Sequence, residues 1–115
     1  MFRKIGQPVI IPGDMGRASW VLVGQPGSME KTFGTTCHGA GRVMSRAAAK
    51  KAARGLDLIG NLAERGVVIR AQSTRGIAEE MPWAYKDVAD VIDVVHRADL
   101  ARRVARLKPL IVVKG

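Results

Sequence analysis

The segment with the strongest chemical character runs from Thr35 to Arg46 and places a histidine before a glycine-rich turn. His38 is followed by Gly39, Ala40 and Gly41, and arginines occupy positions 42 and 46. An imidazole can accept a phosphoryl group, donate a proton or bind a metal. Glycine lets backbone amides approach an anion closely, and arginine presents a planar fork to phosphate oxygens. The segment therefore predicts a phosphate site with a histidine at its edge.

Residue types alone leave other interpretations of this segment open. A lone histidine before a glycine turn is often a loop residue or a hydrogen-bonded core residue. Cys37 precedes His38, but neighbouring side chains on extended backbone point apart. Because Cys37 is the only cysteine and His96 the only other histidine, we expect no zinc site made wholly from this chain.

A helix is expected directly after the glycine turn, over Arg42–Arg54. It contains three consecutive alanines and is followed by Gly55, a typical helix terminator. Arg42, Arg46 and Lys50 recur every four residues and would share one side of it. The free N–H groups of its first turn would add to the phosphate site.

The other expected elements mix short strands with helices. Apolar runs predict strands over 7–11, 18–23 and 67–71, with a glycine-rich loop over 13–16 and a turn over 24–28. Helical spacing predicts helices over 56–65 and 87–97, and the same rhythm continues through Leu100, Val104 and Leu107 to Pro109. Residues 110–113 would be a strand or an extended tail. This order predicts a mixed α+β fold.

Composition limits the class of protein. The 115 residues carry 19 Lys and Arg against 10 Asp and Glu, a formal net charge of +9. That charge favours contact with polyanions, or it belongs to a solvated surface, and charge alone does not decide between these. Apolar residues reach 47% and aromatics 4%, which argues against disorder and against an aromatic base-stacking module. No apolar run is long enough to cross a bilayer, and we expect a cytoplasmic protein with no membrane partner.

Blocks of sequence that span nearly the whole chain carry a more specific signal. They are Gly6–Gly16 with Ala18–Ser19, Phe33–Arg46, Arg75–Pro82, Ala84–Val88, and Val104–Pro109 with the final Lys114–Gly115. In this order the blocks closely resemble the RtcB family of tRNA-splicing ligases. The resemblance implies that residues 1–115 form a single partial domain, the C-terminal nucleotide-binding region of an RtcB-type α+β fold. The metal-binding part of the family lies upstream of the matched region.

The resemblance also implies an activity. Members of the family join RNA ends bearing a 3′-phosphate or 2′,3′-cyclic phosphate to 5′-hydroxyl ends, in tRNA splicing and RNA repair, using GTP and manganese. The histidine of their Cys-His-Gly-Ala-Gly-Arg motif attacks the GTP α-phosphate and becomes a covalent guanylate. In this sequence that histidine is His38.

Further site residues follow from the same resemblance. The guanosine pocket would be lined by Pro12, Gly13, Asp14, Met15 and Ser19, with Gly39, Ala40 and Gly41 near the phosphates. Tyr85 would stack on guanine, Lys114 would reach the nucleotide, and Arg42 and Arg46 would hold phosphates of the nucleotide or of RNA. The residues alone allow simpler roles, because Tyr85 could pack before a helix, Lys114 could be solvated, and Ser19 could bond a neighbouring backbone group.

This sequence departs from the family's pattern in two ways that affect the expected activity. Asp14 stands where the family usually has serine, and its carboxylate would either repel phosphates or accept hydrogen bonds from guanine. The family's manganese ligands cannot be carried over to any residue of this chain. We therefore expect the isolated chain to be neither guanylylated nor active in ligation, and to need the missing N-terminal part of the ligase as well as RNA and GTP. The alternatives are a non-catalytic RNA- or nucleotide-binding remnant and a structural piece that depends on a partner.

Overall fold

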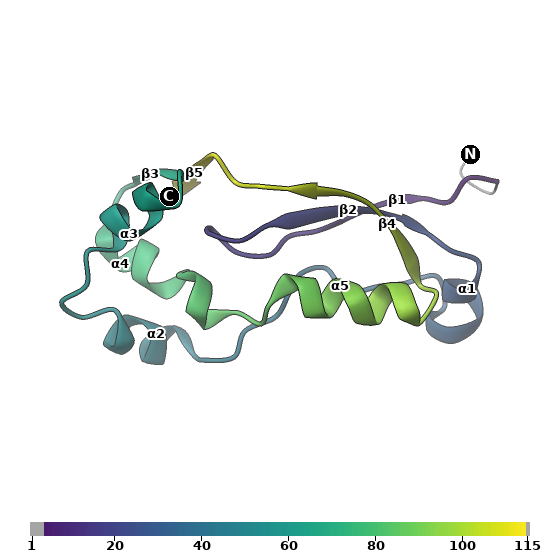
Figure 1. Cartoon of the computed structure of the whole chain (residues 1–115). Coiled ribbons are helices and arrows are strands. Elements are labelled where there is room, and N and C mark those ends of the chain that lie inside the picture. The colour runs from purple at the N-terminus through teal and green to yellow at the C-terminus, as the bar shows by residue number, and fades with distance from the viewer. Residues whose placement is uncertain (1–3, 115) are drawn as a thin grey trace.

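The computed structural model describes residues 4–114 and confirms a mixed α+β fold (Figure 1). The final Gly115 of the family-like blocks lies outside the described residues. In chain order the elements are β1 (Pro8–Ile11), β2 (Ser19–Gly24), α1 (Gly27–Thr32), α2 (Arg46–Ala52), α3 (Leu58–Glu64), β3 (Val68–Ala71), α4 (Thr74–Glu79), the 3₁₀ helix η1 (Pro82–Ala84), α5 (Val88–Arg97), β4 (Ala101–Leu107) and β5 (Ile111–Lys114). No helix within the described residues is both long and apolar enough to cross a membrane.

One end of the molecule is a three-stranded antiparallel sheet with the order β1-β2-β4, and α5 packs along one face of it (Figure 1). The apolar residues of α5 recur at helical spacing, so Val88 and Ile92 meet the sheet as the sequence predicts. Leu22 and Ile11 come from the facing strands and are fully buried against them. This core holds the β1–β2 hairpin and the start of α5 in place.

The other end is built around a parallel pair of strands, β3 and β5, with α3 and α4 packed beside them. Its core includes Leu62, Val67, Ile77 and Met81, each with at most 2% of its surface exposed. Met15, from the β1–β2 loop, is buried in this second core and links it to the sheet.

The molecule is elongated and has more surface than a compact chain of its size. Its extents are 50 × 25 × 22 Å and its radius of gyration is 16.1 Å, against about 13 Å for a compact domain. Its accessible surface is 7662 Å², whereas a monomeric protein of this mass exposes roughly 6,100 Å². Large apolar side chains contribute to the excess, among them Ile10, Val104 and Leu107 on the sheet strands, exposed by 66%, 61% and 47%.

Two sequence predictions are wrong at their boundaries. The expected helix over Arg42–Arg54 begins only at Arg46, where the Ser45 hydroxyl caps it by accepting a hydrogen bond from the Ala48 N–H at 3.1 Å. Residues 42–45 precede it because Gly41 has a φ of +77° and Arg42 bridges to Tyr85. The histidine turn therefore does not open directly into a helix N-terminus.

The helical rhythm expected to continue to Pro109 is also broken, because residues 101–107 form β4. Helix α5 ends at Arg97, and Asp99 then adopts a left-handed φ of 57° that reverses the chain. β4 pairs along the whole of β2, and this long-range pairing overrides the local pattern. The strands expected over 7–11, 18–23, 67–71 and 110–113, and the helices over 56–65 and 87–97, are confirmed to within two residues.

Candidate functional site

The loop between β1 and β2 is organised by Asp14. One carboxylate oxygen accepts hydrogen bonds from the N–H groups of Gly16 and Arg17, both at 2.9 Å. The other lies 3.4 Å from the Arg17 guanidinium, and the Asp14 side chain is 0% exposed. Gly13 is required because a Cβ there would collide with the Ala18 carbonyl oxygen. Asp14 thus holds the shape of the loop, and its carboxylate faces inward.

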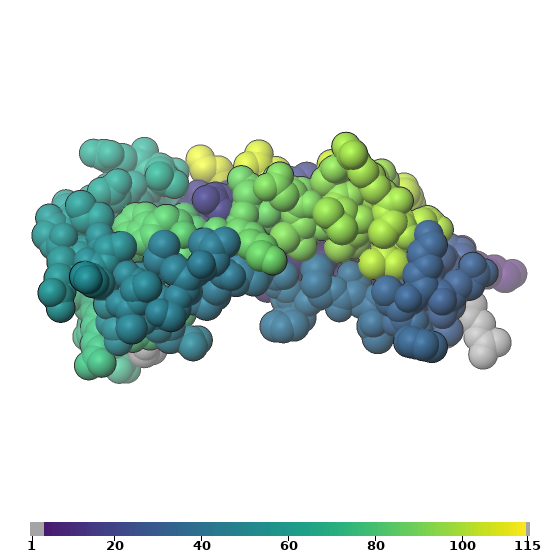
Figure 2. Space-filling view, turned by 90° about the horizontal axis from the view of Figure 1, so that it is seen from below, coloured from purple at the N-terminus to yellow at the C-terminus, as the bar shows by residue number. Residues whose placement is uncertain are grey.

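The histidine segment lies against this loop. The Ala40 N–H donates to the Pro12 carbonyl oxygen at 3.2 Å, and a Cβ built on Gly39 would lie 3.6 Å from the same oxygen. Ala40 is buried in the sheet core, whereas His38 is exposed. In Figure 2 the segment between α1 and α2 (blue) runs over the surface alongside α5. The imidazole is therefore carried on a backbone anchored to Pro12 and open to solvent.

The chain after the turn pairs with the stretch that leads into α5. The Gly41 carbonyl oxygen accepts from the Lys86 N–H at 2.9 Å, and the Val43 N–H donates to the Ala84 carbonyl oxygen at 2.9 Å. Arg42 and Tyr85 face each other in this antiparallel bridge. Gly41 has a left-handed φ, and a Cβ there would meet nothing within 4 Å, so the glycine serves the backbone conformation rather than a close contact.

Arg42 is committed to contacts within the protein. Its guanidinium donates to the Met44 carbonyl oxygen at 3.1 Å, to the Glu79 carbonyl oxygen at 2.6 Å and to the Tyr85 hydroxyl at 3.1 Å. It also lies 3.4 Å from the Glu80 carboxylate and 4.8 Å from the centre of the Tyr85 ring. These contacts use most of its donors, so in this structure Arg42 orients Tyr85 instead of presenting a free fork.

Glu80 contacts three of the other predicted residues, Tyr85, Lys114 and Arg46. Its carboxylate accepts a hydrogen bond from the Tyr85 hydroxyl and lies 3.8 Å from the Lys114 ammonium and 3.7 Å from Arg46. The side chain of Arg46 is 66% exposed and that of Lys114 is 33% exposed. Long ion pairs to exposed cations are weak, so Arg46 and Lys114 can exchange this carboxylate for an anionic ligand more easily than Arg42 can.

Two side chains beside Glu80, those of Tyr85 and Glu79, have shifted pKa values. Burial, followed by the hydrogen bond to Glu80 and its negative charge, raises the pKa of the Tyr85 hydroxyl above 10.0. The hydrogen bond from Lys50, at 2.9 Å, lowers the pKa of Glu79 below 4.5, and the charge of Arg46 acts in the same direction. At neutral pH the cluster therefore holds a neutral phenol and an ionised carboxylate.

The structure places the predicted residues in two groups. The first comprises Pro12, Gly13 and Asp14 of the β1–β2 loop and the segment 38–40, which contacts Pro12 through Gly39 and Ala40. The second comprises Arg42, Arg46, Tyr85 and Lys114 around Glu80, and Gly41 connects the two groups. Met15 is buried in the second core and Ser19 pairs with Leu107 at the start of β2.

Glu79, Glu80 and Lys50 were not predicted as site residues. Each contacts at least one of the predicted cations or shares a partner with it. The signal was available, because two adjacent carboxylates stand inside a family-like block of a strongly basic chain. Within residues 4–114, no group of three or more His, Cys, Asp and Glu side chains is placed so that it could hold a metal ion.

The family model described as tRNA-splicing ligase RtcB matches residues 1–115. The chain belongs to the RtcB family of tRNA-splicing ligases. It is similar to the tRNA-splicing ligase RtcB of Archaeoglobus fulgidus, with 56% identity over 114 residues, which are 99% of this chain and 24% of that protein.

Two further relatives in the RtcB family are tRNA-splicing ligases. The protein of Thermococcus kodakarensis is 54% identical over 99% of this chain and 24% of its own length. That of Pyrococcus furiosus is 54% identical over 100% of this chain and 12% of its own length. The chain thus spans about a quarter or less of these relatives.

Proposed function

We propose that this chain is the nucleotide-binding, nucleophile-bearing part of a GTP-dependent RNA ligase. The whole enzyme would join RNA ends with a 3′-phosphate or 2′,3′-cyclic phosphate to 5′-hydroxyl ends in tRNA splicing and RNA repair. The observation that carries the proposal is the exposed His38 on a glycine segment anchored to the Pro12 carbonyl oxygen. A nucleophile needs this combination of a held backbone and an accessible ring nitrogen.

The chemistry assigned to His38 is a nucleotidyl transfer. A ring nitrogen of His38 attacks the α-phosphorus of GTP, so that a P–N bond forms and the P–O bond to pyrophosphate breaks. An oxygen of the RNA 3′-phosphate then attacks the same phosphorus and releases the imidazole. The 5′-hydroxyl finally attacks the activated RNA phosphate, and GMP leaves. A backbone containing Gly39 and Gly41 lets amides approach the charge on the transferring phosphate.

The residues around Glu80 would bind the nucleotide. Lys114 and Arg46 are only loosely paired with that carboxylate, so a phosphate can recruit them at little cost. Tyr85, held by Arg42 and Glu80, would offer its ring to guanine. The Asp14 carboxylate is already bonded to two N–H groups of its own loop, which favours a structural role over contact with guanine.

Manganese would be bound mainly by the remainder of the ligase. When bound it would withdraw charge from the triphosphate. The described residues offer no metal-ligand cluster of their own. We propose that the isolated chain is inactive and that the complete site needs the N-terminal part.

The open face of the β1-β2-β4 sheet supports the same conclusion. Ile10, Val104 and Leu107 are exposed on these strands, and within the described residues the packed helix, α5, lies on the opposite face (Figure 1). Apolar surface of this kind marks an interface. We infer that the N-terminal part of the ligase covers it.

A chimera would test the function. The chain would be joined behind the upstream three quarters of the Archaeoglobus fulgidus relative, and the product incubated with GTP, Mn²⁺ and RNA ends. We expect joined RNA that is lost in His38→Ala and retained in His96→Ala, a matched exposed histidine on α5. Joining that survives His38→Ala would refute the assignment. Efficient joining by the isolated 115 residues would refute the need for the N-terminal part.

A further inference from the structure

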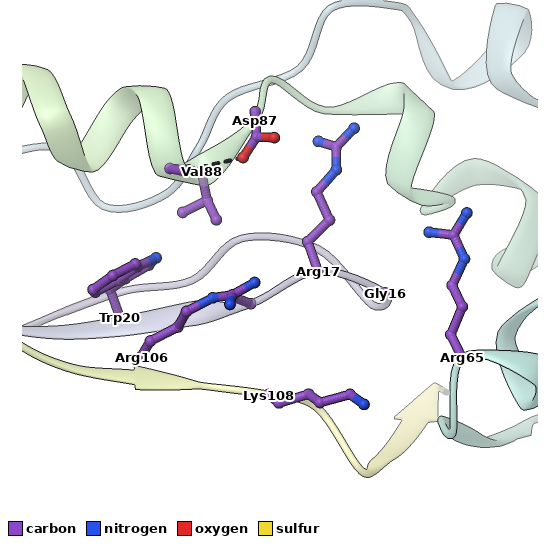
Figure 3. A pocket seen from close by; sticks show the side chains of 10 residues that line it. Gly16, Arg17, Trp20, Arg65, Asp87, Val88, Arg106 and Lys108 are labelled. Atoms are coloured by element: carbon purple, nitrogen blue, oxygen red, sulfur yellow. Dashed lines mark hydrogen bonds between the residues drawn. The ribbon is translucent and has the colours of Figure 1, made fainter.

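A cleft separate from the residues around His38 and Glu80 lies between the β1–β2 loop, the end of α3, the start of α5 and the end of β4. Its volume is about 960 Å³, within the size range of ligand sites. Figure 3 shows cationic side chains from three segments extending around the same space. The cleft is lined by Gly16, Arg17, Ala18, Trp20, Arg65, Asp87, Val88, Ala89, Arg106 and Lys108.

The cleft carries an excess of positive charge. Arg17, Arg65, Arg106 and Lys108 line it, against the single carboxylate of Asp87. Asp87 caps α5 by accepting a hydrogen bond from the Ala89 N–H at 2.9 Å. Among the ion pairs of residues 4–114, none involves Arg65, Arg106 or Lys108. Three cations without an ion pair therefore line one cleft, and such an excess of positive charge favours a polyanion.

The fourth cation, Arg17, is held in place. It pairs with Asp14 at 3.4 Å and donates to the carbonyl oxygens of Tyr85 and Lys86 at 3.4 and 3.2 Å. Because the same stretch of backbone carries the Tyr85 ring, Arg17 connects the wall of the cleft to the predicted nucleotide site. A strand bound in the cleft would therefore lie next to that site without occupying it.

The remaining lining is apolar and includes a half-buried indole. Ala18, Val88 and Trp20 line the cleft, and Figure 3 shows the Trp20 ring beside Arg106. The indole Nε1 of Trp20 is buried without a hydrogen-bond partner. Sites for single-stranded nucleic acid combine cations that follow the phosphates with an aromatic or apolar surface for the bases. In this cleft Arg106 and Lys108 are exposed cations, and the partly exposed Trp20 is the aromatic surface, because Ala18 and Val88 are each only 1% exposed.

We propose that this cleft binds the phosphate backbone of a single-stranded RNA end and so anchors the substrate beside the histidine site. The proposal rests on the proposed ligase function for the identity of the polyanion, and adds a binding site to it. Arg65, Arg106 and Lys108 make the phosphate contacts. Arg17 positions the strand relative to Tyr85.

Equilibrium binding tests the proposal without any catalytic step. A fluorescein-labelled 12-nucleotide single-stranded RNA is titrated with the chain, and with the Archaeoglobus chimera, in the absence of GTP at several salt concentrations. The cleft variant is Arg65→Ala/Arg106→Ala/Lys108→Ala. The control is Arg54→Ala/Arg70→Ala/Arg75→Ala, which removes the same charge from exposed positions outside the cleft. Far-UV circular dichroism checks that both triple variants fold.

We expect the RNA affinity of the cleft variant to depend less steeply on salt. Three lost phosphate contacts should reduce the magnitude of the slope of log K against log salt by about 2. That change corresponds to a loss of affinity of up to about 100-fold at 0.1 M salt. The control should change the slope by less than about 0.7, the value for one contact. The double variant Arg65→Lys/Arg106→Lys keeps the charges and should keep the slope, which guards against misfolding of the alanine variant.

Equal losses in the cleft and control variants would overturn the proposal. So would a cleft variant that keeps its RNA affinity but unfolds the chimera, because the cleft would then be an internal contact with the rest of the ligase. His38→Ala should leave this binding unchanged. A failure of the nucleotidyl-transfer assignment is thereby distinguished from a failure of the cleft.

Discussion

Arg42 offers the sharpest test of how the site is held together, because the structure assigns it a positioning role. Replacing it with alanine removes three hydrogen bonds, to Met44, Glu79 and Tyr85, and the ion pair with Glu80. The two ionic side chains are only 22% and 19% exposed. Breaking such a partly buried network costs about 3 kcal/mol, since the Glu80 carboxylate loses its nearest cation.

Arg46→Ala is the matched control. Arg46 reaches the carboxylates of Glu79 and Glu80 only at 3.7 Å, and its side chain is 66% exposed. Exposed pairs of this kind contribute less than about 1 kcal/mol. The two arginines therefore differ by about 2 kcal/mol in their effect on the free energy of unfolding, although both belong to the same sequence motif.

Urea unfolding followed by far-UV circular dichroism measures this difference. With a slope of about 2 kcal/mol per molar urea, Arg42→Ala should lower the midpoint by about 1.5 M and Arg46→Ala by less than about 0.5 M. Arg42→Lys should remain close to Arg42→Ala, because an ammonium cannot reproduce the guanidinium fork. Equal midpoints for Arg42→Ala and Arg46→Ala would refute the assignment of Arg42 as the organising residue.

Two further predictions concern the pKa of Tyr85 and the β1–β2 loop. Tyr85 is the only tyrosine, so absorbance at 295 nm should show its hydroxyl ionising above pH 10.0 in the folded chain and closer to pH 10 in Glu80→Gln. Because folding raises the pKa of this hydroxyl, the contribution of Tyr85 to stability is complete below pH 10. That contribution is lost as the pH rises through the pKa of the folded state. An unchanged titration in Glu80→Gln would contradict a contribution of the Glu80 carboxylate to the raised pKa. Gly13→Ala should lower the free energy of unfolding by about 3 kcal/mol, because the new Cβ collides with backbone. Gly66→Ala, at φ +77° in open space, should lower it by only about 1–2 kcal/mol. A lower melting temperature for Gly66→Ala than for Gly13→Ala would contradict this prediction.

Much of the fold follows from local sequence patterns. The apolar stripe of α5 is strong enough that Val88, Ile92 and Val95 are buried as predicted. The strand β4 was missed because Val104 and Leu107 fit a helical spacing, and only pairing with β2 makes them extended. Helices α1 and α4 are six residues each, too short for a periodic signal.

The site shows the same division between local and long-range information. The glycine turn and its left-handed Gly41 could be anticipated from the sequence, and the exposed position of His38 is compatible with the predicted role. The ion-pair cluster could not be anticipated, because Glu80 meets Arg42 and Lys114 across long chain separations. Asp14 illustrates the limit most clearly, since its hydrogen bonds to the Gly16 and Arg17 N–H groups were not predicted.

The central claim is that the imidazole of His38 accepts the guanylate. The most direct measurement is peptide mass spectrometry of the chimera after incubation with GTP and Mn²⁺ alone, with samples kept at alkaline pH because phosphoramidates are labile in acid. We predict a GMP adduct on the peptide that contains His38, absent in His38→Ala and unaffected in His96→Ala. An adduct located on any other residue, or one that persists in His38→Ala, would contradict the account.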